Sequence, residues 1–152
     1  MGQQQLLLIV LGVIIVGIAI AVGISMFKSN AQSSNRDQVI NDLNNLAAKA
    51  QQYYRKPIAM AGGGQNFSQF WLVPADTGNA NGSYMISTTA PTAGQYNTFT
   101  NSTGTVADSI TGGDVQTIYI YGLGTELGND GTNKVEACAT VTQNGITTKV
   151  LN

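Results

Sequence analysis

The stretch LLLIVLGVIIVGIAIAVGISMF, residues 6–27, decides the fold, because its 22 consecutive positions carry no charged side chain. At about 1.5 Å rise per residue, such a run forms a helix of roughly 33 Å, which is long enough to cross the hydrocarbon core of a bilayer. It exceeds the apolar region of about 7 to 15 residues found in a cleaved secretory signal, and it is only lightly flanked by positive charge. We therefore expect this helix to stay in the working protein.

The next segment has the pattern of an amphipathic helix that ends at Lys56 and Pro57. Apolar side chains recur at i, i+3, i+4 and i+7, which predicts one stripe that packs on a domain. Residues 28–37 are rich in Ser and Asn, which lower helix propensity, so either a continuous rod or a softened joint is expected there. The glycine triplet at residues 62–64 is interpreted as a flexible exit from the helix. The stripe comprises Val39, Ile40, Leu43, Leu46, Ala47, Ala50, Tyr53 and Tyr54.

Composition predicts a β-rich outer domain after the helix. Charged residues form only 10% of the chain, and β-branched residues and turn formers are abundant, which is unlike a disordered tail. Residues 1–57 hold five basic and two acidic side chains, a net charge of +3, whereas residues 58–152 hold two basic and six acidic ones, a net charge of −4. Phosphate binding needs a basic surface, so the acidic outer domain argues against nucleic acid as a partner.

Strands are predicted from alternating segments of the outer domain. The C-terminal hairpin has the clearest pattern, because Asn144 and Gly145 suit the positive φ angles of a type I′ turn between residues 135–142 and 146–151. Gly122 and Gly124 are interpreted as a turn. The predicted fold class is α+β: a long N-terminal α-helix, apolar in its first half and amphipathic in its second, packed on a small antiparallel β-sheet domain. The other predicted strands are residues 70–73, 83–87, 96–100 and 115–121.

Side chains with catalytic or metal-binding chemistry are scarce. The chain has no histidine and one cysteine, Cys138, which excludes an intrachain disulfide, a cysteine zinc site and a histidine-dependent triad. We interpret Cys138 as a small buried apolar residue, and the oxygen-rich loop at residues 129–133 near Glu126 as a solvated turn without EF-hand spacing. Asp108 and Asp114 have no partner base. The sequence therefore predicts no enzyme, no cofactor and no metal site.

The predicted layout is an apolar helix at residues 1–28, an amphipathic continuation at residues 29–57 and a β-rich outer domain at residues 58–152. It resembles the type IV pilin and pseudopilin family, most specifically where MGQQQ precedes the apolar run and YYRKP, residues 53–57, closes the long helix. The resemblance implies a subunit held in the inner membrane and then extracted by the pilus assembly machinery into a filament of identical copies, with the N-terminal helices bundled at its centre. The apolar surface covered by lipid is then covered by neighbouring copies.

Close helix packing is predicted from small residues in the apolar run. Gly17 with Ala21, and Ala19 with Gly23, have the small-xxx-small spacing that lets two backbones approach. The family usually has glutamate as its fifth mature residue. With Met1 as the first mature residue, Gln5 takes that place as a polar contact, whereas with cleavage after Gly2 the fifth residue is Leu7. The candidate assembly residues are Leu6, Leu7, Leu8, Gly12, Val13, Val16, Gly17, Ile20, Ala21 and Ile24.

The function expected from these patterns is a non-enzymatic structural subunit of a pilin-like filament at the cell surface, with a membrane-inserted precursor. Two alternatives stay open. The first is a single-pass membrane-anchored β domain that binds an extracytoplasmic ligand as a monomer, and the second is a minor pseudopilin of a secretion system, which forms only a short tip or piston. All three use residues 6–27, and they differ in whether that helix meets lipid alone or copies of itself.

Overall fold

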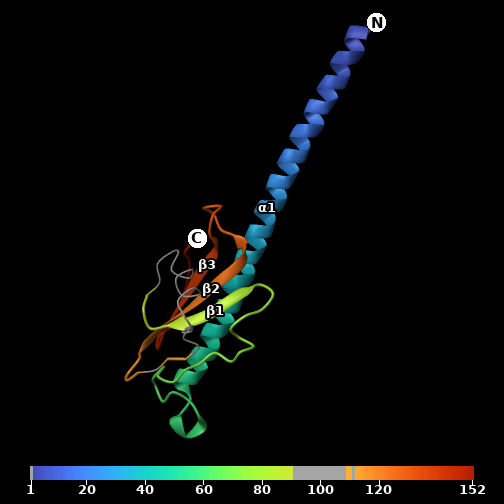
Figure 1. Cartoon of the computed structure of the whole chain (residues 1–152). Coiled ribbons are helices and arrows are strands. Elements are labelled where there is room, and N and C mark those ends of the chain that lie inside the picture. The colour runs from blue at the N-terminus through green and yellow to red at the C-terminus, as the bar shows by residue number, and fades with distance from the viewer. Residues whose placement is uncertain (1, 91–108, 111) are drawn as a thin grey trace, which may run out of the picture.

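A single helix dominates the architecture. The computed structural model describes residues 2–90, 109, 110 and 112–152, so the predicted strand at residues 96–100 and Asp108 lie outside the described residues. α1 runs without interruption over Gly2–Arg55, 54 residues, and Figure 1 shows its first half projecting away from the rest of the chain. Of the two arrangements expected for residues 28–37, the helix forms the continuous rod.

The outer domain is built on one antiparallel sheet. After the short 3-10 helix η1 (Ile58–Met60), the strands are β1 (Gly82–Ser87), β2 (Thr117–Leu127), β3 (Lys134–Thr142) and β4 (Ile146–Val150). They lie in the order β1-β2-β3-β4, with each strand antiparallel to its neighbour. The second half of α1 covers one face of this sheet (Figure 1). The predicted α+β fold, a long helix packed on a small antiparallel sheet, is confirmed.

The core lies between the sheet and the predicted stripe of the helix. Val39, Leu43 and Ala47 are fully buried, while Ile40 is half-buried at the margin. Because side chains alternate across a strand, every second residue of each strand faces the helix. The helix and the sheet thus form one hydrophobic cluster, to which the strands contribute Tyr84, Ile86, Ile118, Ile120, Ala137, Ala139 and Val141.

Two glycines allow the helix to approach the sheet closely, and they correct one prediction. Gly122 and Gly124 lie inside β2 and pair with Tyr84 and Gly82 of β1, so they do not form the predicted turn. A Cβ added at Gly122 would lie 2.7 Å from a methyl carbon of Val39, and one at Gly124 would meet the side chain of Asn35. A strand glycine therefore marks a close approach of two elements here.

The C-terminal hairpin is confirmed, but its turn differs from the prediction. β3 and β4 pair with Val141 opposite Ile146, and the Thr142 N–H donates to the Gly145 carbonyl at 3.0 Å. Neither Asn144 nor Gly145 has the positive φ that a type I′ turn needs. The Thr142 hydroxyl accepts a hydrogen bond from the Gly145 N–H at 3.2 Å, so a side chain helps to close the loop.

The segment between η1 and β1 also departs from expectation. Residues 70–73 form no strand, because pairing there is limited to one isolated bridge between Trp71 and Ser109. The glycine triplet leaves the helix as predicted, but it forms a packed turn in place of a flexible linker. The N–H groups of Gly63 and Gly64 donate to the carbonyls of Tyr53 and Lys56 at 2.8 and 2.9 Å, which satisfies helix-end acceptors.

A polar side chain, that of Asn35, attaches the middle of α1 to the edge of the outer domain that lies nearest the projecting half of the helix. Asn35 is buried, with 5% of its surface exposed. Its side chain donates a hydrogen bond to the Asn81 carbonyl at 2.8 Å and accepts hydrogen bonds from the N–H groups of Thr125 and Glu126 at 3.1 and 3.3 Å. A buried amide needs such partners, because an unsatisfied one costs about 1–3 kcal/mol. Above Asn35, towards the N-terminus, the helix soon leaves the domain.

Candidate functional site

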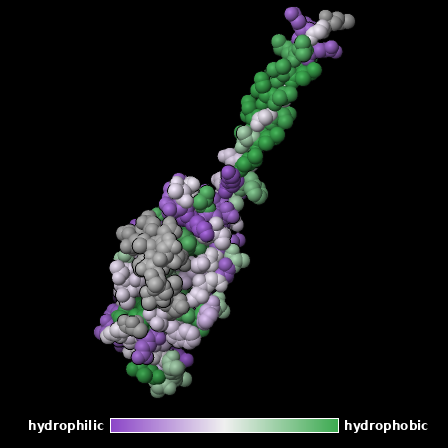
Figure 2. Space-filling view, in the orientation of Figure 1, coloured by the Kyte–Doolittle hydropathy of each residue, from purple (hydrophilic) through white to green (hydrophobic). Residues whose placement is uncertain are grey.

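The candidate site is the first half of α1, which no other part of the chain described by the structure covers. The large apolar side chains between Leu6 and Phe27 are each 51% to 75% exposed. Figure 2 shows them as a continuous hydrophobic rod that projects from a mostly polar outer domain. Within the described residues, α1 is the one helix long and apolar enough to cross a membrane. Exposing such a large apolar surface to water is unfavourable, so the first half of α1 requires an apolar environment.

The predicted assembly residues all lie on this rod, and all of them are exposed. Leu7 is 73% exposed, Val13 68% and Ile20 58%. The rod is apolar on every side, since Leu11 and Ile14, which are not among the predicted assembly residues, are 51% and 53% exposed as well. A helix that is hydrophobic all round is typical of membrane spans and of buried core helices.

The small residues of the rod gather on two of its faces. At about 100° per residue, Gly17 and Ala21 lie roughly 40° apart, and Gly12, Ala19 and Gly23 lie together on the opposite side. A Cβ placed on Gly12, Gly17 or Gly23 would meet nothing within 4 Å. Both faces are therefore open to a neighbouring helix, and both permit close backbone approach.

The N-terminal end of the rod is polar without being charged. Gln3, Gln4 and Gln5 occupy the first turns of α1, and all three are exposed. An amide side chain has two donors and one acceptor, so it can bond to a neighbouring helix or to lipid headgroups. Gln5 lies directly before the apolar run, at the boundary between the polar end and the rod.

The carboxylates considered above as candidate chemical groups form local hydrogen bonds where the structure describes them. Asp130 accepts hydrogen bonds from the N–H groups of Thr132 and Asn133, both at 2.9 Å, so the oxygen-rich loop is a turn closed by its own carboxylate, as predicted. These bonds hold the pKa of Asp130 well below its usual range. Asp114 accepts a hydrogen bond from the Gln116 amide. Among the described residues, no three His, Cys, Asp or Glu side chains gather where they could hold a metal ion.

Cys138 is buried in the sheet, as predicted. Its neighbours in the pairing are Tyr121 on β2 and Lys149 on β4, and its side chain lies on the sheet face away from α1. Burial raises the pKa of the Cys138 thiol to about 11. The thiol therefore stays protonated near neutral pH, which makes it a packing group and a poor nucleophile.

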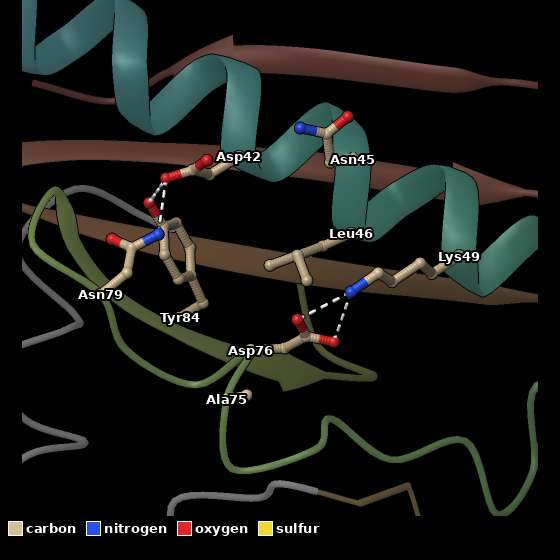
Figure 3. A pocket seen from close by; sticks show the side chains of 8 residues that line it. All are labelled: Asp42, Asn45, Leu46, Lys49, Ala75, Asp76, Asn79 and Tyr84. Carbon is tan, nitrogen blue, oxygen red and sulfur yellow. Dashed lines mark hydrogen bonds and ion pairs between the residues drawn. The ribbon is translucent and has the colours of Figure 1, made fainter.

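A polar cavity of about 190 Å³ lies where the loop before β1 meets α1. Figure 3 shows the side chains that line it. Lys49 forms an ion pair with Asp76 at 2.7 Å, and the Tyr84 hydroxyl and the Asn79 amide donate to Asp42 at 2.6 and 2.8 Å. Both carboxylates are thus engaged in holding the loop and β1 on the helix.

These observations define a class of protein: an α+β outer domain carried on one continuous helix, whose free half is apolar enough to anchor in a membrane. Comparison with protein-family models, with curated proteins and with solved structures found no match for the chain.

Proposed function

We propose that this protein is the structural subunit of a type IV pilin-like filament at the cell surface, assembled through residues 6–27. The observation that carries the proposal is the uncovered apolar rod, continuous with a helix half that is firmly packed in the outer domain. In the membrane-inserted precursor lipid covers the rod, and in the filament the rods of other copies cover it. The transfer needs no refolding, because α1 is helical from end to end.

The distribution of small residues favours a polymer. A single close contact would need one face of small residues, whereas the rod has two faces on opposite sides, around Gly17 and around Gly12 and Gly23. A subunit that uses two different faces can bind one copy on each side, and such heterologous contacts extend into a helical assembly. Gln5 then lies within reach of neighbouring helices at the end of the bundle, where its amide is paired.

A second candidate is a monomeric membrane-anchored β domain. The length of the rod supports it, because roughly 33 Å of apolar helix matches the hydrocarbon core of a bilayer without any help from copies. A minor pseudopilin shares the same design and differs in forming a short assembly. The three functions make different demands on the small residues, since lipid adapts to a bulky side chain and a tightly packed neighbouring helix does not.

The test compares two apolar substitutions on the rod. Gly17→Leu adds bulk on a small-residue face, and Val22→Leu adds bulk between the two faces; neither introduces charge, so membrane insertion is preserved. We expect sheared wild-type cell material to contain long fibres of this chain by electron microscopy. Gly17→Leu is expected to lower the fibre yield about tenfold or more, with Val22→Leu close to wild type, because close backbone approach is lost in the first variant alone.

The amount of chain recovered in the membrane fraction is the control for insertion. Recovery of the wild-type protein only as a detergent-soluble monomer would support the membrane-anchored β domain and contradict the filament. Short stubs that contain this chain among other subunits would instead support the pseudopilin.

A further inference from the structure

Beside the end of α1, a groove of about 400 Å³ combines apolar walls with a cation. The side chains of Trp71 and Val73 are 57% and 39% exposed, and Ala61 also lines the groove. Lys49 is already ion-paired, whereas Lys56 is exposed and forms no ion pair with any residue that the structure describes. Tryptophan is enriched among the residues that contribute most of the binding energy in protein interfaces. The chemistry of this groove fits an apolar side chain with a carboxylate beside it.

The opposite end of the outer domain exposes that combination. Leu127, the last residue of β2, is 52% exposed, and Glu126 before it is exposed as well. The pairing of β2 with β3 shifts register between Leu123 and Leu127, so the two side chains lie at an irregular corner of the sheet. Within the described part of the chain, Glu126 has no ion-pair partner. Arg36 and Lys134 lie at the same end, and Arg36 donates to Asn129 at 2.7 Å.

The groove and the corner of one chain cannot meet, because both are fixed to the same helix. The Glu126 N–H donates to the side chain of Asn35, whereas the groove is lined by residues from Lys49 to Lys56. The helix from Asn35 to Arg55 is roughly 30 Å long at about 1.5 Å per residue. Figure 1 shows the same separation: the β2–β3 connection lies beside the middle of α1, and the end of α1 lies at the far extremity. Contact between them requires a second copy.

We propose that the groove of one copy receives Leu127 of the next copy along the filament, with the Glu126 carboxylate facing Lys56. This inference rests on the proposed function. In a helical filament all copies point the same way and are offset along the axis, so the groove end of one outer domain can meet the corner of a copy displaced by about 30 Å. The contact joins two different surfaces, so each copy that is added leaves a free groove at one end and a free corner at the other. It gives the filament a second, directional interface outside the helix bundle.

Disulfide crosslinking within assembled filaments tests the contact. The full chain carries Ala61→Cys together with Leu127→Cys, and the matched control carries Ala61→Cys with Thr147→Cys, an exposed position on β4. After mild oxidation of sheared filaments, the first pair is expected to give a ladder of covalent multimers on a non-reducing gel. The control pair and each single variant are expected to give none, because Cys138 is buried. Filaments of the first pair that crosslink no better than the control overturn the contact.

A charge exchange gives an independent measurement if the cysteine variants assemble poorly. Lys56→Glu and Glu126→Lys each place like charges at the contact and are expected to lower the fibre yield several-fold. The double variant restores opposite charges and is expected to recover most of that yield. Single variants that assemble like the wild type, or a double variant as poor as the worse single one, contradict the proposal.

The two proposals fail in distinguishable ways. Wild-type chain that forms no fibres contradicts the proposed function and this inference with it. Wild-type fibres without the predicted ladder or charge rescue leave the helix-bundle function in place and contradict only the groove contact.

Discussion

The two halves of α1 are one helix in two different environments. From Val39 to Tyr54 a single stripe is buried against the sheet, and the opposite side of the helix is polar and exposed. Between Leu6 and Phe27 every side is apolar, and every large side chain is at least half exposed. The buried half is thus matched to one fixed partner, whereas the exposed half has no preferred side.

This difference shows how one helix can serve both a fixed and an exchangeable contact. A stripe selects one orientation, because turning the helix would expose apolar residues and bury Asn and Lys side chains. A rod that is apolar all round accepts lipid from any direction, and only its small residues distinguish one side from another. On the proposed function, the first property holds the outer domain in place while the second allows the neighbours of the rod to change.

The junction between the two halves is polar for a structural reason. Residues 28–37 contain Ser and Asn, which weaken a helix in isolation, yet the helix continues through them. Asn35 uses its side chain to bond β2 and the loop before β1, so a residue that is unfavourable for the helix alone is stabilised by the domain. Packing against the domain thus offsets the low helix propensity at Asn35.

The largest expected effect comes from truncating a leucine in the buried half of α1, with an exposed leucine of the rod as the comparison. Leu43→Ala removes a fully buried side chain and is expected to lower the free energy of unfolding of the outer domain by about 2–5 kcal/mol. Leu7→Ala, at a side chain 73% exposed, is expected to leave it unchanged. Urea unfolding of the full chain in mild detergent, followed by circular dichroism, measures both. Equal losses for the two variants would show that the rod contributes to the folded outer domain.

A smaller effect is expected from adding one methyl group where the helix meets the sheet. Gly122→Ala places a Cβ 2.7 Å from Val39 and is expected to cost about 1–3 kcal/mol through overpacking. Gly145→Ala, where a Cβ meets nothing within 4 Å and φ is not left-handed, is expected to stay within about 0.5 kcal/mol of wild type. Thermal unfolding midpoints separate the two. A neutral Gly122→Ala would mean that the helix can withdraw from β2 without loss.

Much of the fold could be predicted because its signals are local. The spacing of apolar residues distinguishes the apolar rod, the amphipathic stripe and the alternating strands from one another. Each of these patterns can be recognised from residues close together in the sequence. Glycine in a strand carries no such signal. The turn predicted at Gly122 and Gly124 is wrong, because these glycines instead make room for Val39 and Asn35, which are distant in sequence.

The candidate site divides in the same way. The exposed rod could be predicted, since length and apolar content suffice to identify it. The clamps formed by Asn35 and Asp42 could not, because their partners lie in loops whose position depends on the completed fold. The groove beside Lys56 likewise exists only once Trp71 is brought against the end of α1. From the sequence alone, polar residues on a helix are expected to face solvent, and only the folded structure shows that a loop covers them.

The smallest expected effect concerns the pH dependence of the Asp42 clamp. Burial raises the pKa of Asp42, but the hydrogen bonds from Asn81, Tyr84 and Asn79 together lower it by more. The pKa of Asp42 therefore lies below the ordinary value of 3.8. A carboxyl whose pKa is depressed by folding stabilises the folded state above its unfolded pKa, and this contribution is lost as the pH falls through the folded pKa. The stabilisation is therefore present at pH 7 and declines below about pH 4.

The comparison of wild type with Asp42→Asn isolates this contribution. The variant is expected to melt a few degrees below wild type at pH 7, and the gap is expected to shrink in acid as Asp42 becomes protonated. Tyr84→Phe removes the 2.6 Å hydrogen bond from the phenol and is expected to weaken the same pH dependence in part. A gap that stays constant from pH 7 to pH 3 would show that the carboxylate charge does not hold the loop on the buried half of α1. In that case the loop is held there by apolar packing and by the other polar contacts, such as the Lys49–Asp76 ion pair.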